Sequence, residues 1–244
     1  MKPHQPDYIL IFTVIALIIF GLIILASASA VVSQEDFGQS YYFLKHQLFY
    51  GLLFGVILWL IAQKTHYQSL SKFALLLLVI TLVLLILVFI PGLGFRHGGA
   101  SRWIVVGPIS IQPTEIAKLT FIIYLAALLS KKKEKAADVS KSLVPFLMST
   151  AIIGVLIIFQ PDIGTLGIIA LTGAIIYFLA GAKISHFIII GILGLAALLI
   201  LIKTAGYRMD RLTVFLHPEI EPQGIGYQIN QALLAIGSGG LFGR

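Results

Sequence analysis

The sequence predicts an all-α membrane protein, a polytopic bundle of about seven transmembrane helices with a large outer loop toward its C-terminal end. Of the 244 residues, 59% are hydrophobic and 11% are charged, and the mean hydropathy is +1.01. A soluble domain carries about 25% charged residues, so this chain has too few polar side chains to cover a water-exposed surface. Its apolar residues also gather in runs of roughly the length that crosses a bilayer.

Seven apolar runs can be followed along the chain. They cover residues 8–32, 48–62, 73–90, 116–129, 144–159, 163–180 and 187–202. The first run is too long for a signal peptide and further spans follow it, so it is typical of an anchor helix. We expect one membrane domain over 1–244, in which 91–115 is an outer loop with the start of a re-entering helix. The polar tail at 203–244 is expected to begin a large outer loop.

Composition excludes several classes of site and partner. The chain has no cysteine, which excludes disulfides, thiolate metal sites and a cysteine nucleophile. Its six histidines show no ligand spacing such as H-x-x-x-H, so we expect no metal site held mainly by histidine. The net charge of +7 comes mostly from loops between apolar runs. That placement is typical of membrane topology and contact with anionic lipids, and we expect no nucleic-acid partner.

The basic residues also predict the topology. With the N-terminus in the cytoplasm, nine of the 17 basic residues fall inside and eight fall outside. The deciding feature is the triple lysine at 131–133, which follows an apolar run in a short loop, where the positive-inside rule is strongest. All the arginines fall on the outer side: Arg96, Arg102, Arg208, Arg211 and Arg244. Because a guanidinium fork suits phosphate, this indicates either an outer anion-binding surface or ordinary contact with lipid headgroups.

A Gln-Pro pair precedes a carboxylate at two places, in Gln112-Pro113-Thr114-Glu115 and in Gln160-Pro161-Asp162. Proline at the first helical position with an acid in the first turn is typical of a helix start. The simplest interpretation is that both carboxylates only cap helices.

The lengths of two runs argue for more than caps. Run 116–129 has 14 residues and spans about 21 Å, and run 144–159 has 16 and spans about 24 Å, whereas the hydrocarbon core is about 30 Å thick. We therefore expect Glu115, Lys118 and Asp162 to lie at membrane depth, where an ionisable group costs at least about 2.5 kcal/mol and usually has a partner. Glu115 and Lys118 share a helical face and could pair, whereas Asp162 needs a partner from elsewhere. The pattern indicates a functional polar cavity, with buried structural pairs as the alternative.

Four stretches together resemble the SEDS family (shape, elongation, division and sporulation proteins), whose members include FtsW, RodA and SpoVE. They are residues 99–104 (GASRWI), 112–119 (QPTEIAKL), 160–165 (QPDIGT) and 226–241 (GYQINQ running into AIGSGGL). They come in the family's order and spacing, and the resemblance covers essentially the whole chain. Residues 179–183, 207–211 and 222–224 look closer to FtsW than to RodA.

The resemblance implies a peptidoglycan glycosyltransferase of the bacterial cytoplasmic membrane. Such proteins polymerise lipid II, a disaccharide-pentapeptide on undecaprenyl pyrophosphate, in cell division or elongation, together with a class B penicillin-binding protein. The residues that match the family's outer polar cavity are Arg102, Trp103, Gln112, Glu115, Lys118 and Asp162. By the same resemblance, Arg208 and Arg211 would be substrate-loop residues. No cofactor is implied with certainty, and a divalent cation bridging the pyrophosphate stays open.

The family pattern is longer than this chain. Members have about ten spans, and their general-base aspartate lies in a Thr-Asp-Phe-like motif further along the large outer loop, beyond Arg244. The resemblance therefore implies that the sequence is C-terminally incomplete and assigns no catalytic residue within it. Two other functions remain open: a lipid II flippase or transporter, and a non-catalytic membrane scaffold for a penicillin-binding protein. Membrane-depth carboxylates would also suit a transport path.

Overall fold

A computed structural model describes residues 6–97, 100–107, 109–130, 138–204, 206–217, 224 and 226–240. It contains two compact units, each with two stretches of chain. Unit 1 comprises Met1–Leu128 and Thr150–Ala170, and unit 2 comprises Leu129–Ser149 and Leu171–Arg244. Helices α6, α7 and α8 contribute residues to both.

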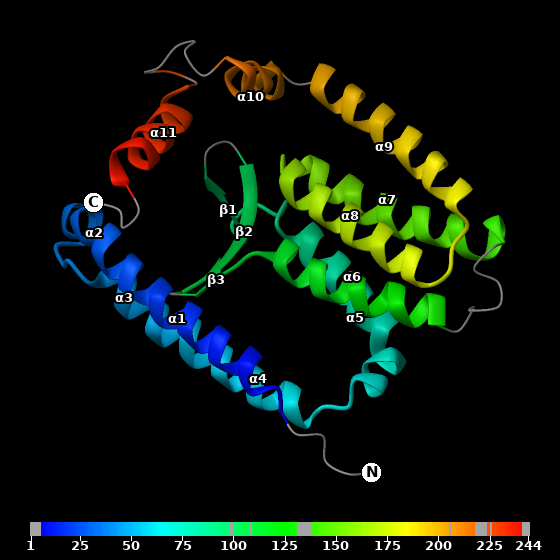
Figure 1. Cartoon of the computed structure of the whole chain (residues 1–244), viewed down its shortest axis with the longest axis horizontal. Coiled ribbons are helices and arrows are strands. Elements are labelled where there is room, and N and C mark those ends of the chain that lie inside the picture. The colour runs from blue at the N-terminus through cyan, green and yellow to red at the C-terminus, as the bar shows by residue number, and fades with distance from the viewer. Residues whose placement is uncertain are drawn as a thin grey trace. The chain divides into compact units, whose positions relative to one another are not determined.

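The described chain is mainly helical (Figure 1). Its α-helices and two π-helical segments are, in order, α1 (Tyr8–Ala28), α2 (Ala30–Phe37), α3 (Tyr42–His46), η1 (Gln47–Leu52), α4 (Leu53–Lys64), α5 (Tyr67–Leu87), α6 (Pro113–Ser130), η3 (Val139–Leu143), α7 (Val144–Phe159), α8 (Ile163–Leu179), α9 (Ile184–Lys203), α10 (Gly206–Leu216) and α11 (Tyr227–Gly239).

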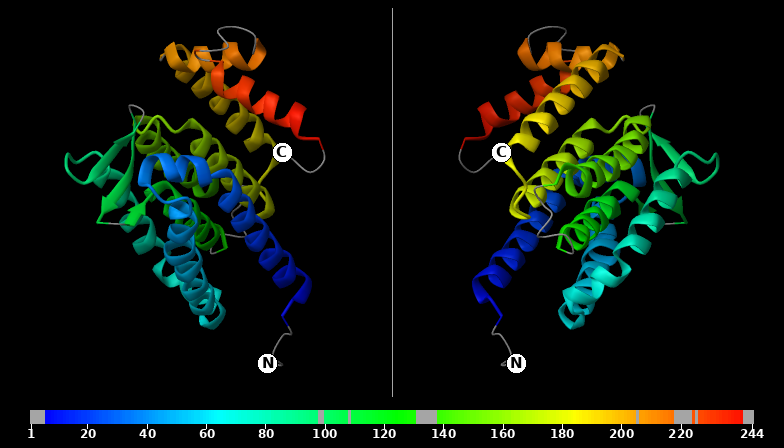
Figure 2. Two further views of the ribbon diagram at one scale, coloured as in Figure 1. Left: turned by 90° about the vertical axis from the view of Figure 1, so that its left-hand side faces the viewer. Right: turned by 90° about the vertical axis from the view of Figure 1, so that its right-hand side faces the viewer.

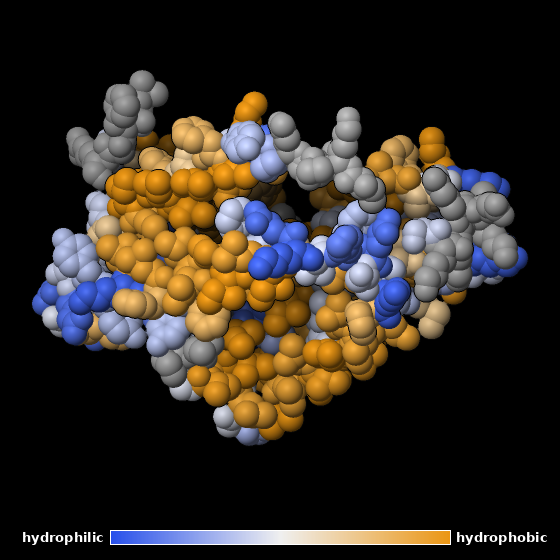
Figure 3. All heavy atoms as spheres, turned by 90° about the horizontal axis from the view of Figure 1, so that it is seen from below, coloured by the Kyte–Doolittle hydropathy of each residue, from blue (hydrophilic) through white to orange (hydrophobic). Residues whose placement is uncertain are grey.

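Among the described residues, six helical segments are long and apolar enough to cross a membrane by length and composition. They are Tyr8–Ala28, Tyr42–Lys64, Tyr67–Leu87, Pro113–Ser130, Val139–Phe159 and Ile184–Lys203. The predicted run 163–180 forms α8, a shorter apolar helix of 17 residues. Apolar side chains cover much of the face seen in Figure 3, as expected of a surface that meets lipid. The predicted polytopic helix bundle is therefore confirmed.

One length argument from the sequence is wrong. Run 144–159 is not a short span, because the π-helical turn η3 continues α7 toward the N-terminus and gives a segment of 21 residues, Val139–Phe159. A helix of this length spans about 31 Å and can cross the hydrocarbon core. The length of the segment that precedes Asp162 therefore does not require this residue to lie at membrane depth. The hydropathy pattern did not include this extension, because η3 contains polar residues.

The polar stretch between α5 and α6 folds as a small antiparallel sheet, which the sequence reading did not predict. Strand β2 (Ala100–Val106) lies between β1 (Gly94–His97) and β3 (Ile109–Ile111). Figures 1 and 2 show the strands together at the end of unit 1 where α5 ends and α6 begins. The close approach of β1 to α5 requires glycine, because a Cβ on Gly94 would lie 1.9 Å from the Val88 carbonyl oxygen.

The core of unit 1 joins α5, α6 and α7. Leu85, Phe121 and Ile157, one from each helix, are fully buried. A hydrogen bond of 2.9 Å between the Thr81 and Thr120 hydroxyls crosses the α5–α6 interface. Because side chains of α5 and α6 contact each other, the end of α5 and the start of α6 are held together. The three-stranded sheet that connects these two helices therefore starts and ends on a packed helix pair.

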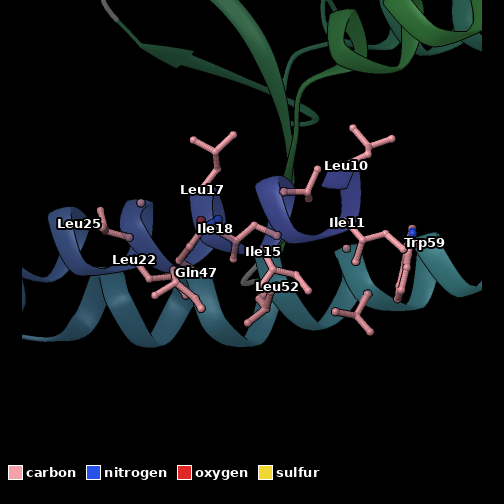
Figure 4. Close-up of a pocket in the computed structure, with 16 residues that line it drawn as sticks. Leu10, Ile11, Ile15, Leu17, Ile18, Leu22, Leu25, Gln47, Leu52 and Trp59 are labelled. Atoms are coloured by element: carbon pink, nitrogen blue, oxygen red, sulfur yellow. The ribbon is translucent and has the colours of Figure 1, made fainter. Parts of the chain in front are cut away.

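The N-terminal part of unit 1 carries an apolar groove between α1 and the η1–α4 segment, with a volume of about 1020 Å³. Figure 4 shows Gln47 among apolar side chains such as Ile18 and Leu22. A Cβ on Gly55, which also lines the groove, would meet nothing within 4 Å. The two helices therefore do not pack backbone to backbone at this glycine.

In unit 2 a buried polar cluster joins three helical segments. The Tyr177 hydroxyl of α8 lies 2.8 Å from the Ser142 hydroxyl of η3 and 2.7 Å from Nδ1 of His186 in α9. All three residues are buried, and the Phe146 ring stacks on the Tyr177 ring. Because buried polar groups need partners, this cluster specifies how these three segments meet.

Candidate functional site

The central contact of the candidate site joins the sheet to the turn between α7 and α8. Arg102 on β2 is half-buried, and its Nε donates a hydrogen bond of 2.9 Å to the carbonyl oxygen of Gln160. Its Nη2 donates a hydrogen bond to the carbonyl oxygen of Pro161. The contact brings the loop between α5 and α6 and the α7–α8 turn to the same end of unit 1, as the predicted alternation of spans requires.

Gln160 holds the same turn from the opposite direction. Its side chain is fully buried, and Nε2 donates a hydrogen bond of 3.1 Å to the carbonyl oxygen of Leu85 near the end of α5. Its Oε1 is buried and has no hydrogen-bond partner in the described structure. A buried unsatisfied acceptor costs about 1–3 kcal/mol, so this side chain combines an anchoring role with a destabilising one.

Asp162 begins α8 as an N-cap. Its Oδ1 accepts a hydrogen bond of 3.3 Å from the backbone N–H of Thr165, and its Oδ2 accepts one of 2.7 Å from the Thr165 hydroxyl. The expectation that the carboxylate finds a distant partner is wrong, because these partners lie only three residues along the chain. An N-cap carboxylate satisfies free helical N–H groups and the helix dipole locally.

Glu115 and Lys118 form the predicted ion pair. The Lys118 Nζ lies 2.9 Å from the Glu115 Oε1, with side chains 30% and 58% exposed, respectively. Glu115 stands in the first turn of α6, where its charge also favours the helix dipole. Within the described residues, no hydrogen bond or ion pair links this pair to Arg102 or Asp162, so a single cavity that holds all of them stays a prediction.

The remaining predicted residues lie in different surroundings. Trp103 follows Arg102 on β2, is 38% exposed and stands opposite Phe95 of β1. Gln112 is half-buried, and its carbonyl oxygen accepts the Glu115 N–H at 3.0 Å. Arg208 and Arg211 belong to α10, but their side chains lie outside the described residues, as does that of Arg96 on β1.

The sequence reading missed the buried polar atoms that support this site. Thr114, within the first Gln-Pro motif, is fully buried and its hydroxyl has no partner among the described residues. The sequence identified Gln160 only as part of the second Gln-Pro motif and did not indicate that its side chain is buried. The repeated Gln-Pro pair was the available signal, because it marked both turns in the sequence.

The opposite end of α7 carries a different acidic cap. Asp138 precedes η3, and its Oδ1 accepts hydrogen bonds from the backbone N–H and the hydroxyl of Ser140. The hydroxyl contact lowers the pKa of Asp138 below its ordinary value, and Lys141, 3.3 Å away, acts in the same direction. In the described part of the chain, no group of three or more histidine or acidic side chains could hold a metal ion.

Chemically, the site presents a guanidinium, a capped carboxylate and an ion pair around the ends of α6, α7 and α8. The guanidinium is held in place by the carbonyl oxygens of Gln160 and Pro161, which accept its hydrogen bonds. Such an arrangement can hold an anionic or hydroxyl-rich ligand.

Comparisons with known proteins agree with this architecture. The family model described as "Cell cycle protein", FTSW_RODA_SPOVE, matches residues 8–244. Stage V sporulation protein E of Bacillus subtilis (strain 168) is 39% identical over 242 residues, which are 99% of this chain and 66% of that protein. A probable peptidoglycan glycosyltransferase FtsW of Trichlorobacter lovleyi is 36% identical over 238 residues, which are 98% of this chain and 62% of that protein. The chain thus spans less than two thirds of the length of these relatives.

Solved structures match as well. A chain of a peptidoglycan synthase complex that coordinates polymerization and crosslinking has a TM-score of 0.65 and 28% identity, covering 91% of this chain and 66% of that one. The rod shape determining protein RodA of Thermus thermophilus has a TM-score of 0.54 and 28% identity, covering 73% and 58% of the two chains. With a family model that matches nearly from end to end, this multi-pass membrane protein belongs to the FtsW/RodA/SpoVE family of cell cycle proteins.

Proposed function

We propose that the full-length protein polymerises lipid II into the glycan strands of peptidoglycan. Relatives named as probable peptidoglycan glycosyltransferases are 35% and 36% identical to this chain. The observation that carries the proposal is the meeting of two outer motifs 58 residues apart, where Arg102 reaches the turn that leads into Asp162. This contact orders the turn that presents the Asp162 carboxylate, at the end of the bundle where we propose that the lipid-linked sugar binds.

The proposed reaction is a glycosyl transfer from an undecaprenyl-pyrophosphate donor. The bond between the donor's anomeric carbon and its pyrophosphate oxygen breaks, and the acceptor sugar's hydroxyl oxygen forms the new glycosidic bond. Cations stabilise the charge that develops on the leaving pyrophosphate, and a carboxylate base removes the hydroxyl proton. We assign no general base within this chain and look for it in the part of the family's length beyond Arg244.

The proposed substrate site is the outer polar surface. Its members are Arg102, Trp103, Gln112, Glu115, Lys118, Asp162, Arg208 and Arg211. We further propose that the protein lies in the bacterial cytoplasmic membrane with its N-terminus in the cytoplasm and this surface outside. A class B penicillin-binding protein is the proposed partner, and the similar chain from a peptidoglycan synthase complex supports it.

Polymerisation by purified protein tests this function. The full-length protein, co-purified with its class B penicillin-binding protein, is incubated with lipid II, and glycan products are separated by gel. We expect polymer from the wild type and from Lys45→Ala, which removes an exposed cation of α3, but at least about tenfold less from Arg102→Ala and Asp162→Ala. Unchanged polymerisation in both site variants contradicts the proposed site, and a wild type that moves lipid II across vesicles without polymerising it supports a transporter.

A further inference from the structure

We propose that Arg102 is a positioning residue, whose guanidinium clasps the end of α7 and thereby orients the Asp162 carboxylate. This inference deepens the proposed function and rests on it for its kinetic consequences. It differs from the role of an outer arginine as a ligand of pyrophosphate, because Nε and Nη2 are already engaged by backbone carbonyls.

The clasp satisfies carbonyls of the turn that follows α7. Helix α7 ends at Phe159, and the two clasped carbonyls belong to the next two residues, Gln160 and Pro161. Proline itself has no N–H, which removes one donor from the turn. A cation is also favoured at the negative end of the helix dipole, so the guanidinium meets both a hydrogen-bonding and an electrostatic need here.

The geometry requires arginine specifically. Two neighbouring carbonyl oxygens, those of Gln160 and Pro161, accept from two different nitrogens of one planar side chain. Lysine carries the same charge as a single point on a flexible stem and cannot reproduce a fork of two directed donors. A lysine at this position therefore keeps the charge but loses the clasp.

Arg102 acts on Asp162 through the backbone. The Asp162 carboxylate is occupied by Thr165, and the ion pairs found among the described residues join other partners. The clasped carbonyls come directly before Asp162 in the chain. Their position therefore sets where the N-cap lies and how α8 begins.

The clasp is anchored in two directions. Arg102 stands on the central strand of the sheet, where its neighbour Trp103 pairs with Phe95 of β1 and Ile104 pairs with Ile111 of β3. On the other side, the Gln160 side chain ties the turn to the Leu85 carbonyl of α5. The turn is therefore held between the sheet and α5, and a displacement of the sheet is passed on to Asp162.

Hydrogen exchange of the full-length protein tests the clasp without reference to activity. The reporters are the amides of Thr165 and Leu166, which donate to the side chain and the carbonyl of Asp162. We expect both Arg102→Ala and Arg102→Lys to speed exchange across 160–166 by about tenfold or more, while Lys45→Ala leaves it unchanged. Wild-type protection in Arg102→Ala, or full protection in Arg102→Lys, overturns the proposal.

Kinetics separate a positioning role from a ligand role. If Arg102 orients Asp162, both variants lower kcat/KM for lipid II by about tenfold to a hundredfold and to the same extent, because lysine restores the charge without the clasp. A KM that rises in Arg102→Ala and recovers in Arg102→Lys identifies a pyrophosphate ligand and overturns the positioning role. If the wild type makes no polymer, the proposed function fails, and the exchange measurement alone decides the clasp.

Discussion

The two Gln-Pro-acid motifs have nearly the same letters and different structures. In the first, the motif directly follows strand β3, Pro113 begins α6, and Glu115 lies within the first turn, exposed and paired with Lys118. In the second, Gln160 and Pro161 follow the end of a helix, and Asp162 caps the next helix from outside. The element that precedes the motif decides which role the acid takes.

The glutamines differ even more than the acids. Gln112 is half-buried and contributes a backbone carbonyl to its turn. Gln160 is fully buried, and both its side chain and its carbonyl hold other elements. A helix end leaves carbonyls that must find donors, whereas a strand that leads into a helix does not. The second motif therefore carries tertiary contacts, and the first carries local ones.

The largest difference is expected between the two glutamines. Gln160→Ala removes the donor to the Leu85 carbonyl and leaves a cavity, and it also removes the unsatisfied Oε1 acceptor. We therefore expect a net loss of about 2 kcal/mol. Gln112→Ala removes a half-buried side chain and should cost less than about 0.5 kcal/mol. Thermal unfolding in detergent measures both. Equal losses in the two variants contradict the distinction drawn between the motifs.

A smaller difference separates the two acids. Asp162→Ala removes an N-cap and should cost about 1 kcal/mol, whereas Asp162→Ser keeps a capping oxygen and should recover most of it. Glu115→Ala breaks an exposed pair at (i, i+3) and should cost about 0.5 kcal/mol or less. Unfolding midpoints at matched detergent concentration give the ranking, and a larger effect at Glu115 reverses the roles assigned here.

Two buried threonines of α6 should respond with opposite sign. The Thr114 hydroxyl is buried without a partner among the described residues, so Thr114→Val should be neutral or stabilise by up to about 1 kcal/mol. The Thr120 hydroxyl bonds to Thr81 at 2.9 Å, so Thr120→Val should destabilise by about 1 kcal/mol. Both changes nearly conserve volume, so packing differences largely cancel. A destabilised Thr114→Val indicates that this hydroxyl has a partner.

Hydropathy predicted the spans well, because runs of apolar residues report directly on transfer to lipid. It could not find η3, since a π-helical turn with the letters VSKSL looks like a loop. The sheet was indicated by a run of β-branched residues, Ile104 to Val106, before the turn residues Gly107-Pro108. A search for long apolar runs that could span a membrane does not detect so short a strand. Arg102 donates to a backbone carbonyl 58 residues away along the chain. Every residue has such a carbonyl, so the sequence does not indicate which one an arginine contacts.

The smallest expected effect concerns the other acidic cap described above, Asp138, where the Ser140 hydroxyl lowers the pKa of the carboxyl. A carboxyl with a lowered folded-state pKa adds stability above its unfolded pKa of about 3.9 and loses it as pH falls through the folded value. We therefore expect wild-type stability, compared with Asp138→Asn, to exceed that of the variant at neutral pH and to converge with it below pH of about 4. Because the side chain is exposed to solvent and screened, the difference should be small beside that of Asp162→Ala. A gap that widens on acidification contradicts the assigned sign, and unfolding midpoints measured across this pH range decide it.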